Sequence, residues 1–279
     1  MANTIATFKQ YVPMLDEVYK NAALTSVLDG AAELASQGKN AGELVIPMME
    51  MDGLADYSRN GGYVDGNVSL IYETKKCNFD RGRMFNVDNM DNAETAGIAY
   101  GRLAAEFIRT KVVPELDAFR FAEYASIEGI SSATGTLSSG ANVVTALRDA
   151  VTKMDEDEVP VEERYLFITP TLGGMIDDLD TTKSRAILSR FAKVTHVPQT
   201  RFYTAITQGD NGFAKAGNDI NFMIVHKPAV IQFQKHVAPK VITPEQNQSA
   251  DAWKFGYRNV GIAEAYQNKV AGIFVHHKA

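Results

Sequence analysis

The stretch TKVVPELDAFRF, residues 110–121, places a proline inside what otherwise has the pattern of one long amphipathic helix. A proline inside a helix removes one hydrogen bond and crowds the carbonyl four residues earlier, which here belongs to Thr110. The apolar positions nevertheless keep helical spacing across the proline: Ile108, Val112, Leu116 and Phe119. This pattern favours one helix kinked at Pro114 over two helices joined at residues 111–113.

The predicted helix runs from Ala93 to about Ile127 and would span ~50 Å. Asp91, followed three residues later by Glu94, has the form of a capping box and marks the N-terminal end. Three pairs of opposite charge, each three residues apart, are expected to support its polar side: Glu106 with Arg109, Asp117 with Arg120, and Arg120 with Glu123.

Upstream of the helix, the apolar residues alternate as in strands. ELVIPMMEM (43–51) and VSLIYET (68–74) predict two strands, and the glycine-rich residues 53–67 between them predict the loop of a long hairpin. A third strand-like run, KCNFDRGRMFNVD, covers residues 76–88. With about fourteen residues in each limb the hairpin projects ~45 Å. Since a two-stranded ribbon is marginal alone in water, we expect it to lie on its own domain or on a neighbouring chain.

The remaining chain mixes helices and strands without strict alternation, which favours an α+β fold over a parallel-sheet α/β fold. Residues up to about 40 are predicted as a short extended arm and then a helix, and GISSATGTLSSG (129–140) as a flexible linker. Other predicted elements are a helix over 142–154, short helices or turns over 171–180 and 182–193, strands over 164–170, 201–206, 219–226, 230–236 and 240–244, and further strands or a hairpin over 251–277.

Composition excludes some classes of function. The net charge of −6, without any run of Lys or Arg, argues against a protein that depends on phosphate contacts. Cys77 is the only cysteine, so neither an intramolecular disulfide nor a multi-cysteine zinc site is possible. The first twenty residues lack the apolar stretch of a signal peptide, and no run of eighteen apolar residues occurs. We therefore expect a soluble protein made in the cytoplasm, without a membrane partner.

Candidate chemical groups all have simpler structural explanations. The common phosphate, zinc and serine-nucleophile motifs are absent. His276 and His277 would point to opposite faces of a strand, so we interpret them as surface or packed histidines. Asp88 and Asp91 fit a strand end and a helix N-cap better than a metal site. The acidic run 155–158 is interpreted as a solvated connection. The sequence thus predicts no catalytic, cofactor or metal site, and no enzyme.

Cys77 lies in a strand-like run beside Lys75 and Lys76. A nearby cation can lower the pKa of a thiol, but no histidine adjoins in the sequence. We interpret Cys77 as a small buried hydrophobic residue.

The order of these parts resembles that of the major capsid protein of tailed double-stranded-DNA bacteriophages, the family with the HK97-type fold. The resemblance covers about residues 8–277. It rests on runs whose order and spacing also fit: DRGRMFNVDNMDNAET (80–95), VVPELDAFRFA (112–122), VPVEERYLFITP (159–170), RFYTAI (201–206), NFMIVHKPAV (221–230) and ADAWKFGYRNV (250–260).

The resemblance implies a division of the chain into named parts. These are an N-terminal arm over 1–42, an extended loop and lead-in strand over 43–91, the spine helix of a peripheral domain over 92–129, an axial domain over 130–240, and C-terminal strands returning to the core over 241–279. Because the chain begins almost at the arm, we expect no long scaffolding segment fused to it.

The resemblance also implies a structural function. Copies would assemble into hexamers and pentamers of an icosahedral phage head, which encloses double-stranded DNA without reading its sequence. Expected partners are other copies, portal and scaffolding proteins, and decoration proteins, in a virion assembled in the bacterial host cytoplasm. Tyr57, Arg59 and Tyr63 in the hairpin tip would contact a neighbour, since tyrosine and arginine are favoured at interfaces. Pro114 would bend the helix along a curved shell wall.

Some members of the family join subunits through lysine–asparagine isopeptide bonds. Lys75 and Lys76 lie in the hairpin region, but nothing in the sequence identifies a partner asparagine or a catalytic carboxylate, so no such bond is expected. Two other functions remain open. An encapsulin-like cellular compartment shares the fold and carries enzyme cargo, and a soluble α+β enzyme with an unrecognised site belongs to a different class.

Overall fold

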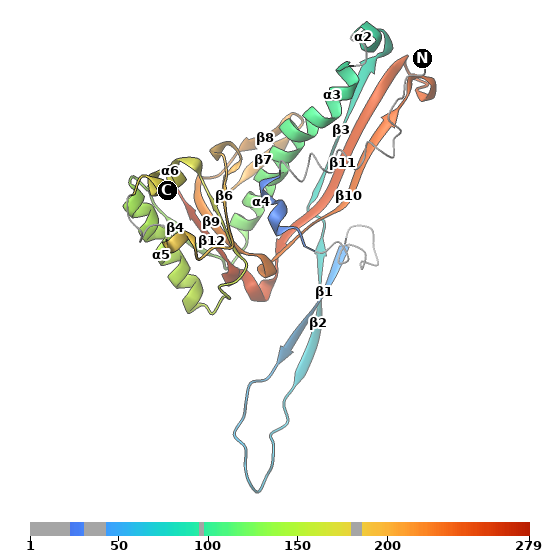
Figure 1. Cartoon of the computed structure of the whole chain (residues 1–279). Helices are drawn as coiled ribbons and strands as arrows, with labels where there is room; N and C mark the ends of the chain where they lie inside the picture. Colours follow the sequence, from blue (N-terminus) through green and yellow to red (C-terminus); the bar gives the residue numbers. More distant parts are fainter. Residues whose placement is uncertain (1–22, 31–42, 95–97, 180–185) are drawn as a thin grey trace.

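The computed structural model describes residues 23–30, 43–94, 98–179 and 186–279. Figure 1 shows a body built from two groups of strands around one long helical segment, with a two-stranded hairpin that extends away from it. The strands form a five-stranded sheet, a three-stranded sheet and two hairpins. The predicted α+β class is confirmed. The arm and helix predicted before residue 40 lie mostly outside the described residues, which include there the 3-10 turn η1 (Leu24–Leu28).

The predicted hairpin is confirmed. Strands β1 (Glu43–Met51) and β2 (Val68–Lys76) are antiparallel and pair without a register shift. Each strand has nine residues rather than about fourteen. Beyond them the two limbs continue to a tip, where a single bridge joins Ser58 to Gly62.

The three-stranded sheet contains the longest strands among the described residues. Strand β11 (Ala252–Ala265) is central and pairs antiparallel with β10 (Val230–Ile242) and β3 (Phe79–Asp88). The two strands predicted over 230–236 and 240–244 are thus one strand, with a bulge between Gln234 and His236. Pro239 is compatible with β10 because β10 is an edge strand, where every second N–H points away from the neighbouring strand.

One helical segment lies along this sheet. It consists of α3 (Ile98–Phe107), a π-helical turn (Ile108–Val112) and α4 (Val113–Ser126), which confirms one helix rather than two. The proline is accommodated by the wider turn before it, in which the Val113 N–H donates to the carbonyl of Ile108. The Thr110 hydroxyl donates to the Glu106 carbonyl at 2.7 Å. A bend at Pro114 stays a prediction.

The predicted N-cap is displaced by three residues. Helix α2 begins at Asn89 and ends at Glu94, so Asp91 lies inside its first turn. Asp88, the last residue of β3, instead accepts a hydrogen bond from the Met90 N–H at 2.9 Å. An aspartate one position before a helix is well placed to satisfy a free N–H of the first turn. The capping residue is therefore Asp88.

The five-stranded sheet has the order β4-β12-β9-β5-β6. Its strands are β4 (Ser131–Thr134), β12 (Ile273–His277), β9 (Ile220–His226), β5 (Arg164–Ile168) and β6 (Lys193–His196). Helices α5 (Gly140–Glu156) and α6 (Pro170–Asp177) supply apolar residues to one face, and α4 to the other. Every residue of β9 is buried, so this sheet forms the centre of the core.

Two sequence predictions in this region are wrong. Residues 129–140 are not simply a linker, because they contain β4, which pairs in parallel with β12 near the C-terminus. Residues 201–206 do not form a strand. The 3-10 turn η4 (Gln199–Arg201) ends there, and the hairpin of β7 (Ile206–Gly209) and β8 (Gly212–Lys215) begins. Strand β4 depends on a partner strand that is distant in the sequence, and residues 201–206 connect an irregular turn to a hairpin.

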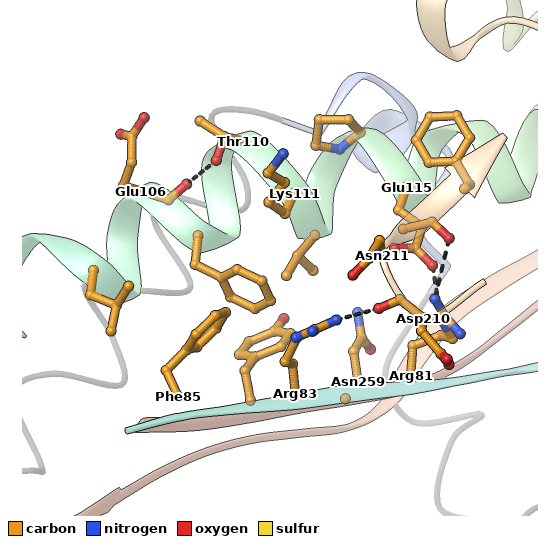
Figure 2. Close-up of a pocket in the computed structure, with 18 of the residues that line it drawn as sticks. Arg81, Arg83, Phe85, Glu106, Thr110, Lys111, Glu115, Asp210, Asn211 and Asn259 are labelled. Atoms are coloured by element: carbon orange, nitrogen blue, oxygen red, sulfur yellow. Dashed lines mark hydrogen bonds and ion pairs between the residues drawn. The ribbon is translucent and has the colours of Figure 1, made fainter. Parts of the chain in front are cut away.

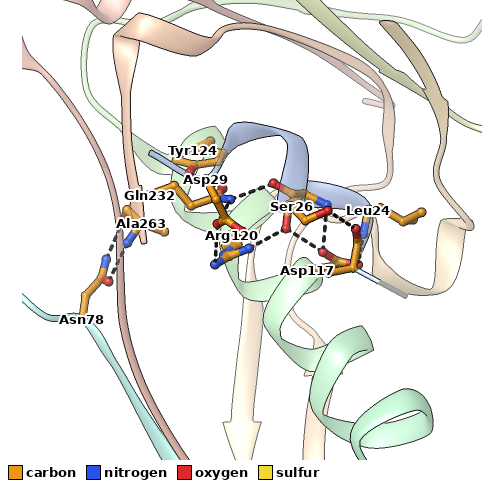
Figure 3. A network of polar contacts seen from close by, with 11 residues as sticks. Leu24, Ser26, Asp29, Asn78, Asp117, Arg120, Tyr124, Gln232 and Ala263 are labelled. Carbon is orange, nitrogen blue, oxygen red and sulfur yellow. Dashed lines mark hydrogen bonds and ion pairs between the residues drawn. The ribbon is translucent and has the colours of Figure 1, made fainter. Parts of the chain in front are cut away.

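The predicted charge pairs of the helix are only partly correct. Glu106 and Arg109 form the expected exposed ion pair, with Oε1 and Nη2 2.7 Å apart. Asp117 and Arg120 are buried instead, and they bond to groups outside the helix (Figure 3). The Glu123 carboxylate accepts a hydrogen bond from Asn78 at 3.4 Å. The helix therefore uses this side for tertiary contacts.

A buried polar network attaches η1 to α4 and β10. Asp117 accepts hydrogen bonds from the N–H groups of Leu24 and Thr25 and from the Thr25 hydroxyl, the last at 2.6 Å. Arg120 donates to the Thr25 hydroxyl at 2.9 Å and forms an ion pair with Asp29 at 3.2 Å. Figure 3 shows these groups converging between the turn and the helix. The network fixes where η1 joins the body.

Candidate interaction surfaces

Three residues that the sequence offered as candidate chemical groups can now be placed in the structure. His276 is buried, stacks on Phe222 and is hydrogen-bonded to Asn221 at 2.9 Å, so it is a packed histidine. Cys77 is half-buried rather than fully buried, and burial raises the pKa of its thiol. Asp155 is more than a solvated charge, because its carboxylate lies 2.7 Å from the buried Arg164 guanidinium.

Two further properties concern only the part of the chain that the structure describes. Among those residues, no three or more His, Cys, Asp or Glu side chains are grouped so that they could hold a metal ion. No described helix combines the length and the apolar character needed to cross a membrane.

The hairpin of β1, β2 and their connecting residues carries most of the exposed large apolar side chains among the described residues. Leu54 is fully exposed and Tyr63 is 87 % exposed. Eight other large apolar side chains of the hairpin are exposed as well: Met49, Met51, Tyr57, Val64, Val68, Leu70, Ile71 and Tyr72. Exposed large apolar side chains gathered on one element indicate an interaction site.

The three tip residues singled out from the sequence have different positions. Tyr57 and Tyr63 are brought together across the tip, with ring centroids 4.9 Å apart and planes tilted by 60°. Arg59 is exposed in the turn between them. The exposure of the apolar residues along β1 and β2 was missed, although the run MMEM, which does not alternate, was a signal that apolar side chains of β1 would be exposed.

The root of the hairpin is firmly attached to the body. The Asn78 side chain pairs with the backbone of Ala263 on β11: its amide nitrogen donates to the carbonyl at 2.8 Å, and its oxygen accepts from the N–H at 3.1 Å. Lys75 of β2 forms an ion pair with Glu264 at 3.6 Å. Burial, and then the nearby Glu264 charge, raise the pKa of Glu123 beside them. These contacts fix the direction in which the hairpin leaves the body.

A second surface is an open cleft of about 1340 Å³ between the three-stranded sheet and the helical segment. Its walls come from β3 and β11 below, from α3, the π-helical turn and α4 above, and from the β7–β8 turn at one side (Figure 2). Three aromatic rings pack one after another along the cleft. The ring centroids of Phe85 and Phe107 are 4.7 Å apart, and those of Phe107 and Tyr257 are 6.3 Å apart. The π-helical turn before Pro114 contributes directly to this wall.

Two arginines of β3 fasten the β7–β8 turn to the sheet at the side of the cleft. Arg81 forms an ion pair with Glu115 of α4 at 2.8 Å and donates to the carbonyl of Gly209 at 2.6 Å. Arg83 donates to the carbonyl of Asp210. Alternation along β3 places both guanidinium groups on the face that lies toward the helix. The side of the cleft is therefore defined by charge-assisted hydrogen bonds.

Asn259 of β11 forms part of the floor. Its side chain is 1 % exposed, and neither its amide nitrogen nor its oxygen has a hydrogen-bond partner. Figure 2 shows the side chain rising from the sheet between Arg81 and Arg83. Buried polar atoms without a partner are uncommon in native proteins, so this amide is a notable feature of the cleft.

No family model and no curated protein matches the chain. Solved structures do match it over most of its length. A structure from Mycobacterium phage Che8 is 15 % identical, with a TM-score of 0.63, and the match covers 89 % of each chain. A virus-like particle from Pyrococcus furiosus is 14 % identical, with a TM-score of 0.62, covering 98 % of this chain and 100 % of the other. The capsid of Myoviridae phage XM1 is 13 % identical, with a TM-score of 0.55 and 92 % coverage of both.

These similarities define the class of fold. The chain has the HK97-type fold that is shared by phage capsids and a virus-like particle. The resemblance to tailed-phage capsid proteins inferred from the sequence is thereby confirmed at the level of the fold.

Proposed function

We propose that this chain is the major capsid subunit of a phage head. The observation that carries the proposal is an HK97-type fold with a hairpin whose large apolar side chains are exposed in the isolated chain. Such a surface is stable in water when a partner covers it, and identical copies are the partners that a shell supplies. The role is structural, without a catalytic site or a cofactor.

Assembly requires a contact between two different surfaces of the subunit. A heterologous contact that closes by rotation gives rings, here the hexamers and pentamers of an icosahedral head. The hairpin would cover a neighbouring subunit, with Tyr57, Arg59 and Tyr63 as contact residues of its tip. Their exposure, and the contact between the two tilted tyrosine rings, support this role.

The division into domains follows the two larger sheets in this proposal. The three-stranded sheet and the helical segment would form the peripheral domain, and the five-stranded sheet with α5 and α6 the axial domain. Because β10 (Val230–Ile242) pairs with β11 of the three-stranded sheet, we place the end of the axial domain near residue 229 rather than 240. Strand β12, near the C-terminus, returns to the axial domain, where it pairs with β9. The hairpin would be the extended loop, and the residues before it the arm.

The shell would enclose double-stranded DNA by confinement rather than by binding. A net charge of −6 predicts little affinity for free DNA, because affinity of that kind comes from neutralising phosphates. A filter-binding titration tests this, and tight binding by isolated subunits would contradict it. Portal, scaffolding and decoration proteins are the further expected partners, in a virion assembled in the host cytoplasm.

Size-exclusion chromatography of the purified chain, followed by negative-stain microscopy of the earliest fraction, tests the proposed function. Rings, sheets or closed polyhedral particles are the expected result. A chain that stays monomeric over a wide range of concentration and salt, and also with its phage partners co-expressed, would overturn the proposal. A monomer with a ligand-dependent shift in melting temperature would instead favour the alternative of a soluble α+β enzyme with an unrecognised site.

A cellular compartment of the encapsulin type is the second candidate. The observation in its favour is the match to the Pyrococcus furiosus particle, which covers all of that chain and 98 % of this one. The contents of native particles separate the two functions. Double-stranded DNA inside favours the phage head, whereas a packaged enzyme favours the compartment.

A further inference from the structure

One face of the β1–β2 ribbon is an apolar strip that contains two methionine thioethers. Met49 and Met51 lie two positions apart in β1, so their side chains point to the same face. The register places Leu70 directly opposite Met49. It places Val68 directly opposite Met51, and residues in such pairs share a face. The exposed fractions are 59 % for Met49, 67 % for Met51, 67 % for Val68 and 50 % for Leu70. The two methionines therefore lie within an apolar strip that solvent reaches.

The two faces of the ribbon differ in character. Tyr72 of β2, which is 63 % exposed, lies on the same face as Leu70 and extends the strip. Ser69, Ile71 and Lys75 of β2 point to the opposite face, and two of these three side chains are polar. In the shell proposed above, the strip is the face that gains most from being covered by a neighbouring copy, because it carries the larger share of the described apolar side chains.

A thioether is oxidised by a peroxide such as hydrogen peroxide. The sulfur lone pair attacks one oxygen, the O–O bond breaks, and the other oxygen leaves as hydroxide, which takes the proton of the transferred hydroxyl and becomes water. The sulfur loses two electrons and becomes a sulfoxide, while the peroxide is reduced. Accessibility selects the methionines that react: Met49 and Met51 are exposed, whereas Met154 and Met223 are fully buried.

The only thiol of the chain competes poorly for the oxidant. A thiol reacts as its thiolate. Cys77 is half-buried, and burial raises the pKa of its thiol, so little thiolate is present at neutral pH. A thioether has no proton to lose, so its reactivity does not depend on such a pKa. Among the described residues, exposed methionines are therefore the sulfur groups that a peroxide modifies first.

A sulfoxide within this strip opposes its burial. The sulfoxide replaces a flexible apolar side chain by a polar one, and covering its oxygen with apolar groups costs free energy when no donor is present. We propose that Met49 and Met51 form a modification site, at which oxidation by a peroxide keeps the free subunit out of the shell. Once a neighbouring copy covers the strip, the same thioethers are protected. This inference rests on the proposed function and adds to it a chemical condition on the free subunit.

Treatment of the wild-type subunit with hydrogen peroxide, followed by removal of the peroxide, tests the site. Peptide mass spectrometry should find sulfoxide at Met49 and Met51 and none at Met154 and Met223. The subunit concentration at which half the protein is in particles should rise at least tenfold. Treatment with both methionine sulfoxide reductases, one for each sulfoxide epimer, should restore the untreated value. Met49 and Met51 that stay unoxidised, or oxidised subunits that assemble like untreated ones, would overturn the inference.

The same treatment of assembled particles tests the protection. Met49 and Met51 should carry less sulfoxide in particles than in free subunits treated in parallel. Equal oxidation in the two states would show that the strip is not covered, and would overturn the inference.

Two matched variants assign the effect to the strip. The double variant Met49→Leu, Met51→Leu keeps the apolar volume without the sulfurs, so it should assemble equally well before and after peroxide treatment. The control, Met84→Leu, Met90→Leu, removes methionines that are 51 % and 69 % exposed in β3 and α2, and it should stay as sensitive as the wild type. Peroxide sensitivity that persists in Met49→Leu, Met51→Leu would overturn the modification site while the capsid function stands. Failure of the untreated wild type to assemble with its phage partners would remove both.

Discussion

The Thr25 hydroxyl donates to the Asp117 carboxylate at 2.6 Å, although the two residues are 92 positions apart in the sequence and both are buried. The same hydroxyl accepts a hydrogen bond from Arg120 at 2.9 Å. One small side chain thus connects the turn before the hairpin to Asp117 and Arg120 of the helix. Its position explains why these charges, which have the spacing of a surface pair, face the interior.

Replacing this hydroxyl should destabilise the subunit. Thr25→Val keeps the shape of the side chain but leaves Asp117 and Arg120 each without one partner, at an expected cost of ~1–3 kcal/mol in the free energy of unfolding. Urea denaturation measures it. Thr145→Val is the control, because that exposed hydroxyl bonds only to the Ala141 carbonyl of its own helix. Equal effects of the two substitutions would contradict a structural role for the buried network.

Pro114→Ala should leave the subunit folded and change the assembled shell. An alanine N–H can donate to the Thr110 carbonyl, so the π-helical turn can give way to a regular α-helix. The expected result is a wild-type circular dichroism spectrum together with an altered particle size or yield by negative-stain microscopy. Unchanged shells would show that the proline does not set the curvature of the helix.

The tip tyrosines should matter for assembly and not for folding. In the double variant Tyr57→Ser, Tyr63→Ser, the free energy of unfolding of the isolated chain should change by less than ~0.5 kcal/mol, because both rings are exposed. The particle fraction in size-exclusion chromatography should fall. Val161→Ser removes an exposed apolar side chain from the connection between α5 and β5, outside the hairpin, and serves as control. Equal particle fractions for the tip variant and the wild type would exclude the tip as a contact surface.

Protonation of His276 should weaken the fold at mildly acidic pH. Burial lowers the pKa of His276 below its usual 6.5, and a proton on Nδ1 would also replace the acceptor that Asn221 uses. Between the folded and the unfolded pKa the unfolded chain binds more protons, so stability is present above pH 6.5 and is lost as the pH falls through the folded pKa.

The urea midpoint, measured from pH 8 to pH 5, tests this dependence. His276→Gln should show a smaller loss of stability below pH 6.5 than the wild type. His277→Gln, at the neighbouring and more exposed position, is the control. A wild-type loss that persists unchanged in His276→Gln would assign the effect to another group, such as His226, whose pKa burial also lowers.

The candidate surfaces were visible in the sequence to different degrees. The hairpin and its tip followed from alternation and glycine placement, and the structure adds that Tyr57 and Tyr63 contact each other. The cleft could not be inferred, because Asn259 and Phe107 come from segments about 150 residues apart. Nothing in the local sequence distinguishes Asn78, which is paired, from Asn259, which is not.

The sequence by itself determined the elements with a strong local period: the hairpin strands, the helix through Pro114, α5 and the buried strand β9. It did so because side-chain spacing reports which face of an element will be covered. Only the tertiary structure decided that Ser131–Thr134 is a strand, that β10 passes through Pro239, and that Asp117 and Arg120 are buried. The strand Ser131–Thr134 and the two buried charges depend on partners distant in the sequence, and Pro239 depends on the edge position of β10, which is set when the sheet assembles.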